Sequence, residues 1–334
     1  MAEPESKEIP LRKRKAWMFS QSEAPRLSAL FESPEGRKKF WRYWVKDNLV
    51  NGIDLAVHFG LKLIPMDAAS NFGAWLGPFA LPRFHKTAIR RGRATLARLL
   101  PEKSEAERDA ILYRNWQAQG RLMTEFSAIN RLRGHMDRIQ LHNFERLRDT
   151  AKAGPVVVVG MHLGNWEIGP LILSTAGLQP NINYIPPSGR AKAWISRRVR
   201  LKAGVAFLPP GHQGTRASVK VLKDGGMVSM FCDEGVSGKI RGPLFGRAPH
   251  QEGNLAVAVR LARMTGAKIC PWYNLRGKGF RFDAYFLPPI ELPPEDKPGA
   301  RLAEDILMLN GVIEPVISAH LDQWYFLDNS LPEG

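Results

Sequence analysis

The pattern of apolar and polar positions predicts short buried strands alternating with helices in the second half of the chain. Residues 156–159 are four consecutive valines between Gly154-Pro155 and Gly160, which is typical of a strand covered on both faces. Further strands are predicted at residues 182–185, 205–208, 227–232, 267–273 and 279–286, with helices between them. We therefore expect an α/β fold in which a central mixed sheet of about seven strands is flanked by helices.

The first half of the chain has helical periodicity. Residues 38–63 carry apolar side chains near helical spacing, and residues 64–81 are apolar but interrupted by Pro65, Asp67 and several glycines. Neither stretch has the twenty or so mostly apolar residues of a spanning helix. An interfacial amphipathic helix is one interpretation, a tilted or partial membrane segment is a second, and a helix packed on the protein's own core is a third.

Two more helices are predicted before the sheet begins. Residues 82–100 form a basic helix, and Ser104 with Glu107 matches a capping box that begins a helix reaching about residue 131. The expected organisation is a basic flexible tail at 1–37, a helical, membrane-associated lead-in at 38–150 and an α/β core at 151–326, with lead-in and core forming one domain.

Composition adds a strong positive charge, because 48 Lys and Arg residues outnumber 32 Asp and Glu residues, a net charge of +16. Such a field attracts nucleic acid, an anionic membrane or an acidic substrate without choosing among them. Basic residues at 7–15 followed by Trp17 and Phe19 suit an anionic membrane surface, and equally a solvated tail. No zinc-ligand spacing is present, and we expect no metal or cofactor.

Candidate chemistry follows the valine strand. His162 and Glu167 stand at its carboxyl end, where ligands bind in open α/β sheets. Imidazole can accept a proton from a hydroxyl, and a carboxylate on its other nitrogen would fix the tautomer. The alternative is a structural histidine followed by an acid that favours a helix start.

The motif His-Leu-Gly-Asn-Trp-Glu at 162–167 resembles the first block of the lipid A late acyltransferases (lauroyl/myristoyl type), within the glycerolipid acyltransferase superfamily. Residues 242–247 and the Gln323-Trp324 pair resemble later family segments, so the likeness spans roughly residues 65–324. The resemblance implies that His162 is a general base and Glu167 its partner. Where the family usually has an arginine after a strand-end tyrosine, this chain has Ile185, which moves that expectation to Arg197 and Arg198.

The remaining site predictions are substrate-binding residues. Besides Arg197 and Arg198 they are Asn165, Asp233, Glu234 and Arg247, together with backbone N–H groups near Gly164 that would stabilise an oxyanion.

The expected function is transfer of a fatty acyl chain from an acyl carrier protein thioester to a hydroxyl of a lipid A precursor. The expected location is an anionic membrane surface, namely the cytoplasmic face of a bacterial inner membrane. Alternatives are a coenzyme A thioester donor, another membrane lipid such as a lysophospholipid or glycolipid as acceptor, and a thioesterase-like hydrolase. A nucleic-acid-binding protein would leave the strand-end cluster unexplained, so we expect no nucleic acid partner.

Overall fold

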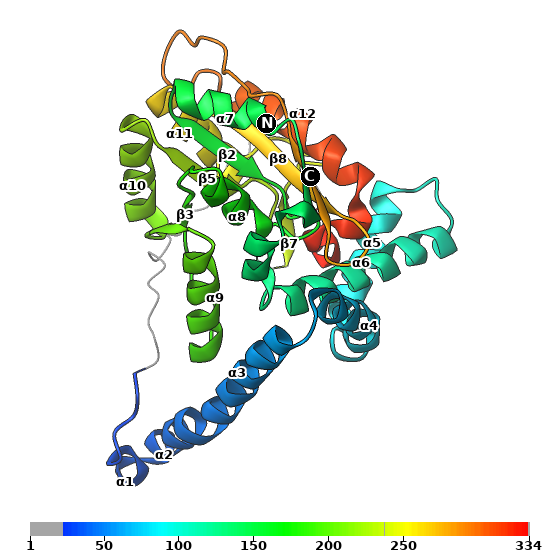
Figure 1. Cartoon of the computed structure of the whole chain (residues 1–334), viewed down its shortest axis with the longest axis vertical. Coiled ribbons are helices and arrows are strands. Elements are labelled where there is room, and N and C mark those ends of the chain that lie inside the picture. The colour runs from blue at the N-terminus through cyan, green and yellow to red at the C-terminus, as the bar shows by residue number, and fades with distance from the viewer. Residues whose placement is uncertain (1–22, 237, 333–334) are drawn as a thin grey trace, which may run out of the picture.

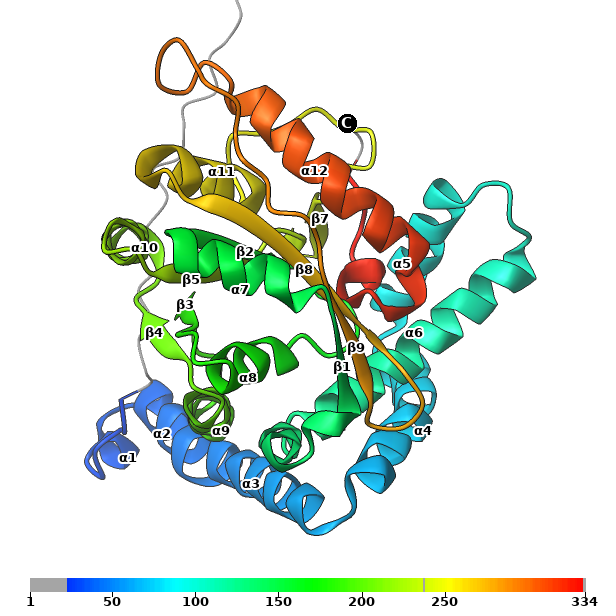
Figure 2. The ribbon, with the colours of Figure 1, turned by 45° about the horizontal axis from the view of Figure 1, so that its top comes forward.

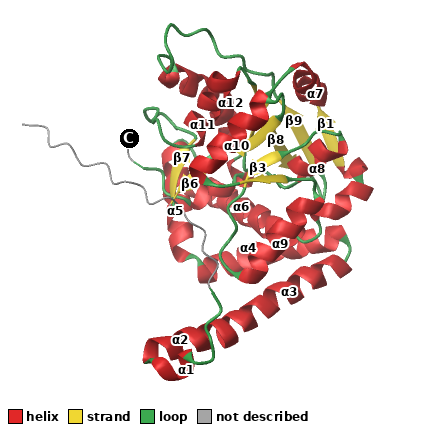
Figure 3. Cartoon of the chain, turned by 90° about the vertical axis from the view of Figure 1, so that its left-hand side faces the viewer, coloured by secondary structure: helices red, strands yellow, loops and turns green. Residues whose placement is uncertain are grey.

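The N-terminal part of the molecule is a chain of helices that wraps one side of the sheet. The computed structural model describes residues 23–236 and 238–332; most of the predicted basic tail, including residues 7–19, lies outside them. Figures 1 and 3 show the first helices extending away from the sheet. The helices are α1 (Ala29–Glu32), α2 (Pro34–Trp41), a π-helical turn (Arg42–Lys46), α3 (Asp47–Leu63), α4 (Met66–Phe84), α5 (Lys86–Leu99) and α6 (Glu105–Glu125).

A capping box fixes the start of α6, and two glycines allow α4 and α6 to pack closely. Ser104 accepts the backbone N–H of Glu107 while the Glu107 carboxylate accepts the backbone N–H of Ser104, so the predicted capping box is confirmed at the start of α6. Gly73 on α4 lies directly against Gly120 on α6: a Cβ on Gly73 would stand 2.4 Å from the Gly120 carbonyl oxygen. These two helices therefore pack at a distance that only glycine permits at this crossing.

The central sheet has seven strands in the order β1-β9-β8-β2-β5-β3-β4, and it is mixed, as predicted. Strand β2 lies near its middle and runs parallel to both neighbours, whereas β8 and β9 are antiparallel. The strands are β1 (Ile139–His142), β2 (Val156–Gly160), β3 (Asn181–Asn183), β4 (Ala206–Leu208), β5 (Met227–Phe231), β8 (Lys268–Arg276) and β9 (Phe282–Phe286). A separate hairpin is formed by β6 (Glu234–Val236) and β7 (Lys239–Gly242).

Alternate valines of β2 point to opposite faces of the sheet and enter two different cores. Val157 and Val159 pack in the core that contains α11 and α12, while Val156 and Val158 pack in the core that contains α7 and α8. Figure 2 shows the helices on the two sides of the sheet. They are α7 (Phe144–Ala153), α8 (Ile168–Thr175), α9 (Arg190–Lys202), α10 (Gly211–Lys223), α11 (Asn254–Thr265) and α12 (Leu302–Ala319).

The chain ends against the carboxyl end of β2. After α12, two 3-10 turns, Leu321–Gln323 and Tyr325–Asp328, bring Trp324 alongside Leu163 in an isolated antiparallel bridge. Within the described residues, no helix is both long enough and apolar enough to cross a membrane. The membrane-associated role predicted for residues 38–150 therefore stays a prediction.

Candidate active site

His162 lies just beyond β2, opposite the carboxylate of Asp233. Gly160 pairs with Phe231 in the parallel β2–β5 register, so the second residue after each strand is His162 on one side and Asp233 on the other. The His162 Nδ1 atom is 3.0 Å from Asp233 Oδ1, and the His162 backbone N–H donates to Asp233 Oδ2 over 2.7 Å. Asp233 is fully buried. Its carboxylate therefore holds both the ring and the backbone of His162.

The predicted pairing of His162 with Glu167 is wrong. Glu167 is the residue directly before α8. Its carboxylate forms a bidentate ion pair with Arg200 on α9, over 3.0 Å to Nε and 2.5 Å to Nη2. Spacing along the chain could show that an acid follows the histidine, but not which acid shares its hydrogen bond. Asp233, predicted to bind substrate, makes the contact with His162 that the sequence suggested for Glu167.

Aromatic rings surround the imidazole of His162. The ring centroids of Phe231, Trp166 and Phe326 lie 4.1, 4.7 and 5.0 Å from that of His162, and the Tyr325 centroid lies 6.3 Å away. The His162 side chain keeps 17% of its surface exposed. Since Nδ1 faces Asp233, a neutral ring carries its proton there and its lone pair on Nε2. The arrangement suits a base that accepts a proton in mostly apolar surroundings.

The C-terminal segment completes this environment. The indole N–H of Trp324 donates to Asp233 Oδ2 over 2.8 Å, and the backbone N–H of Tyr325 donates to the His162 carbonyl over 3.0 Å. Trp324 is fully buried, and burial raises the pKa of the Tyr325 hydroxyl. The sequence had singled out Trp324 only as part of a family-like ending, without a role at the histidine.

The Glu167–Arg200 pair forms a second charged group beside the first. Burial lowers the pKa of the Arg200 guanidinium, but the charge of Glu167 and its hydrogen bonds outweigh this, so the pKa is raised. The Arg200 guanidinium also lies 5.6 Å from the Tyr184 ring. The Arg200 guanidinium therefore stays protonated, and 28% of its side chain is exposed.

Sequence reasoning missed Arg200 in favour of Arg197 and Arg198. Both of those arginines are exposed, and Arg198 lies over the Trp194 ring at 5.3 Å. The buried face of α9 holds Ala191, Ile195, Ser196 and Val199. Helical periodicity places position 197 opposite that face and positions 198 and 200 on its two flanks, so periodicity alone does not distinguish Arg200 from Arg198.

Three predicted substrate-binding side chains are engaged within the protein. Asn165 is fully buried and bonds Glu125 and the Glu167 backbone N–H. Glu234 accepts the backbone N–H of Asn254 over 3.0 Å at the start of α11. Arg247 donates four hydrogen bonds to carbonyl oxygens of residues 240, 241, 243 and 244. These contacts contradict a role in direct substrate contact for Asn165 and leave Arg247 one of its five N–H donors.

Backbone donors near Gly164 are also partly occupied. The N–H groups of His162, Leu163, Asn165 and Glu167 all bond acceptors of the protein. Gly164 has a φ of +58°, and a Cβ there would stand 2.5 Å from Asn274 Oδ1. The glycine is therefore required by both backbone conformation and space.

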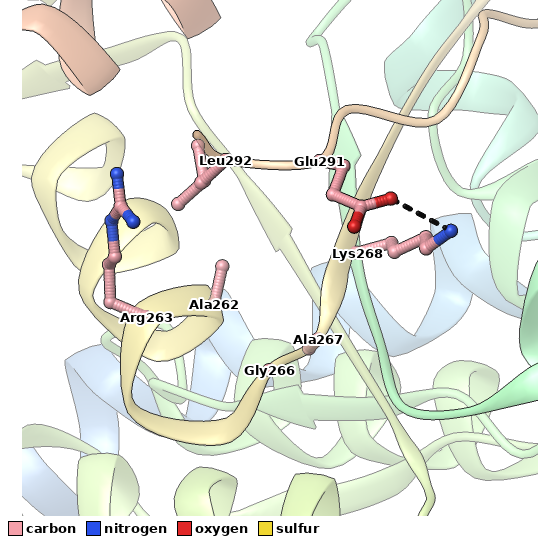
Figure 4. A pocket seen from close by; sticks show the side chains of 7 residues that line it. All are labelled: Ala262, Arg263, Gly266, Ala267, Lys268, Glu291 and Leu292. Atoms are coloured by element: carbon pink, nitrogen blue, oxygen red, sulfur yellow. Dashed lines mark ion pairs between the residues drawn. The ribbon is translucent and has the colours of Figure 1, made fainter. Parts of the chain in front are cut away.

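A pocket elsewhere in the molecule does not bear on this chemistry. It lies at the other end of the sheet, where β8 begins with Lys268 opposite Val156, and Figure 4 shows its lining. Lys268 pairs with Glu291 at 3.1 Å, and Arg263 bonds Asp305 and the Pro293 carbonyl. Its charged groups are thus paired within the protein.

Comparisons with known proteins identify the family to which the chain belongs. The model of the bacterial lipid A biosynthesis acyltransferase family matches residues 39–331. A comparison with curated proteins found no match. Among solved structures, the 1-acyl-sn-glycerophosphate (LPA) acyltransferase PlsC from Thermotoga maritima is similar, with 14% identity and a TM-score of 0.33, covering 62% of this chain and 88% of that one.

The family match spans the helical lead-in, the sheet and the C-terminal segment, and so includes every residue of the site described above. The predicted family is therefore confirmed, and the chain belongs to the bacterial lipid A biosynthesis acyltransferases and is an acyltransferase.

Proposed function

We propose that this protein transfers a fatty acyl group from an acyl carrier protein thioester to a hydroxyl group of a lipid A precursor, with His162 as the general base. The observation that carries the proposal is the 3.0 Å contact between His162 Nδ1 and Asp233 Oδ1 at the carboxyl end of β2. It leaves Nε2 of the ring as the proton acceptor, and it stabilises the imidazolium that forms when the proton arrives.

The reaction then needs no covalent enzyme intermediate. Nε2 of His162 takes the proton of the acceptor hydroxyl as its oxygen attacks the thioester carbonyl carbon. The resulting tetrahedral intermediate collapses, the carbon–sulfur bond breaks, and the imidazolium returns its proton to the leaving thiolate. The ring contacts of His162 are with Trp166, Phe231, Tyr325 and Phe326, and these rings exclude water that would compete with the acceptor.

Arg200 is the cation best placed for an anionic group of the substrates. It lies on α9 and bonds Glu167, five residues after the base; it is partly exposed, and Glu167 holds its guanidinium in a fixed orientation. Nη1 makes no hydrogen bond within the described residues. We propose that it binds a phosphate of the acceptor or the developing oxyanion.

The positive charge of the protein is the basis for the proposed acyl donor. The chain carries a net charge of +16, and exposed cations cover α9 and α10: Lys192, Arg197, Arg198, Lys202, Arg216, Lys220 and Lys223. An acidic acyl carrier protein would be attracted to such a surface, as would the phosphates of coenzyme A, at short range and with a strong dependence on salt.

The location that we propose is the cytoplasmic face of a bacterial inner membrane, reached through exposed apolar stripes. On α3 the stripe consists of Leu49, Val50, Ile53 and Val57, and on α4 it consists of Phe72, Trp75 and Phe79 with stacked rings. Exposed cations flank these stripes: Lys38, Lys39, Arg42, Lys46, Arg83 and Lys86. Apolar stripes bordered by cations are typical of helices that lie in an anionic lipid surface.

The test is a transfer assay with purified protein and acyl carrier protein or coenzyme A thioesters of several chain lengths. A lipid A precursor and a lysophospholipid serve as acceptors. His162→Ala is compared with His142→Ala as a matched control. His142 also bonds an aspartate, with its Nε2 atom 3.0 Å from Asp283 Oδ1, but it lies outside the site. We expect loss of transfer by about 10³-fold or more in the first variant alone.

Equal product from the wild type and His162→Ala would overturn the proposed base. Release of free fatty acid without any acylated lipid would favour the hydrolase alternative. Transfer to the lysophospholipid alone would reject the lipid A precursor as acceptor.

A further inference from the structure

Glu125, the last residue of α6, is a buried carboxylate between the helical lead-in and the loop that follows His162. It has no exposed surface. Ser70 of α4 donates to Oε1 over 2.5 Å, Arg276 of β8 forms an ion pair with the same oxygen, and Asn165 Nδ2 donates to Oε2 over 2.9 Å. One side chain thus joins α4, α6, β8 and the loop after β2.

Two side chains of β8 hold the backbone of the loop at residues 163–165. Asn274 donates from Nδ2 to the Leu163 carbonyl over 3.1 Å and accepts the Asn165 N–H over 2.9 Å. Arg276 donates to the Gly164 carbonyl over 3.4 Å. The consecutive peptide groups between His162 and Glu167 are therefore fixed from one side, by residues that do not touch the imidazole.

Arg276 extends the same network to the opposite side of the site. Its backbone N–H donates to Gln323 Oε1 over 2.7 Å, next to Trp324, which bonds Asp233. Hydrogen bonds thus run from Glu125 through Arg276 to the segment that holds Asp233, and through Asn165 to the backbone of Glu167. Through these bonds and the intervening main chain, Glu125 is linked to the segments that carry both charged pairs of the site.

We propose that Glu125 is a positioning residue that sets the orientation of His162 and Glu167, an inference that rests on the proposed function for its kinetic consequence. A buried ion pair is a weak source of stability compared with apolar packing of the same volume, whereas it fixes directions that apolar packing does not. A catalytic base needs such fixed directions, since a displacement of about 1 Å can cost about 100-fold in rate.

The experiment compares Glu125→Gln with Asp305→Asn. Asp305 is the matched control, because it is also fully buried and paired with an arginine, Arg263, at 2.7 Å, and Arg263 lines the pocket at the other end of the sheet. We expect Glu125→Gln to lower kcat by about 10- to 100-fold with little change in KM. Both variants are expected to lower Tm to a similar extent, because each leaves a buried arginine without its charged partner. Asp305→Asn should nevertheless leave kcat within about 2-fold of the wild-type value.

A second readout does not depend on acyl transfer. The ring signals of His162 are identified by NMR from their loss in His162→Ala and are followed through a pH titration. We expect Glu125→Gln to move both their chemical shifts and their titration midpoint, and Asp305→Asn to leave both unchanged.

Unchanged His162 signals in a folded Glu125→Gln protein would overturn the inference, and so would an equal fall in kcat in both variants. If the wild type transfers no acyl group but Glu125→Gln still alters the His162 signals, the proposed function is rejected and the positioning role is supported.

Discussion

Trp324 and His162 donate to the same oxygen of Asp233, the indole N–H over 2.8 Å and the backbone N–H over 2.7 Å. That oxygen is thereby fully engaged, and Oδ1 is the one that faces the imidazole. The carboxylate cannot rotate without breaking a bond to one of these donors. Its orientation, and hence the tautomer of His162, is set by the C-terminal segment.

Asp233→Asn is expected to lower kcat by about 10³-fold or more, because an amide nitrogen would face donors and the ring would lose its charged partner. Trp324→Phe keeps the carboxylate and removes one donor, so a smaller fall of about 10-fold is expected. Steady-state transfer kinetics at matched folded fraction measure both. A Trp324→Phe enzyme with wild-type kcat would contradict a role in orienting Asp233.

Glu167→Gln is expected to abolish transfer and to destabilise the fold by up to about 3 kcal/mol, because Arg200 would remain as a partly buried cation without its charged partner. The double variant Glu167→Leu with Arg200→Met removes both charges, so it should recover much of the stability. Thermal unfolding and transfer rates are measured on both. If the double variant also recovered activity, the pair would be structural and our role for Arg200 would fail.

Gly120→Ala is expected to destabilise the protein by about 1–3 kcal/mol, since the new Cβ would stand 2.1 Å from the Gly73 carbonyl oxygen. Gly52→Ala on α3 is the control, because nothing lies within 4 Å of its Cβ position. It should stabilise the helix by about 0.5–1 kcal/mol. Chemical denaturation of both variants measures the difference, and equal effects would contradict close packing of α4 on α6.

Stability is expected to fall in acid because of His58. Burial, with smaller contributions from Lys62 and Lys202, lowers the pKa of His58 to about 4, from 6.5. The unfolded chain binds a proton below about pH 6.5 while the folded chain stays neutral at this residue. Stability is therefore lost progressively as the pH falls from about 6.5 to 4, by about 3 kcal/mol in all.

Denaturant unfolding at several pH values measures this loss. In His58→Gln the free energy of unfolding should depend less on pH between about pH 6.5 and 4. The Nδ1 atom of His58 bonds Ser127 at 2.9 Å, which glutamine can partly replace. A slope that persists unchanged in His58→Gln would assign the acid sensitivity to other groups.

Replacing Ile53 and Trp75 by aspartate is expected to weaken binding to anionic phospholipid vesicles by at least about 10-fold, because both apolar stripes then carry a charge. Met264→Asp is the control, since Met264 is also exposed and apolar but lies on α11. Vesicle sedimentation with phosphatidylglycerol and with phosphatidylcholine gives the affinities. Equal losses in the two proteins would reject the stripes as the lipid contact.

The fold was largely predictable where a local pattern matched the tertiary role. The four valines of β2 and the capping box at Ser104 needed no distant information. Strand β1 and helix α7 were missed, because Ile139–His142 has a single buried residue and no longer apolar run. β9 falls within the strand predicted at residues 279–286; it lies between β1 and β8, with three of its five residues buried.

The site was predictable as a place but not as a set of contacts. His162 comes just after a central strand, so the sequence predicted its position at the carboxyl end of the sheet. Its carboxylate partner comes from the neighbouring strand, 71 residues later, and only the pairing of β2 with β5 brings them together. The arginine on Glu167 depends likewise on how α9 packs.

The bridge between Leu163 and Trp324 also governs when the base is assembled. Asp233 and Trp324 are 91 residues apart, so the ordered carboxylate depends on a contact that carries the entropic cost of closing a long loop. On a ribosome, the valine strand would emerge long before the residues that orient its histidine. Local opening of the last two 3-10 turns would likewise silence the base while the sheet stayed folded.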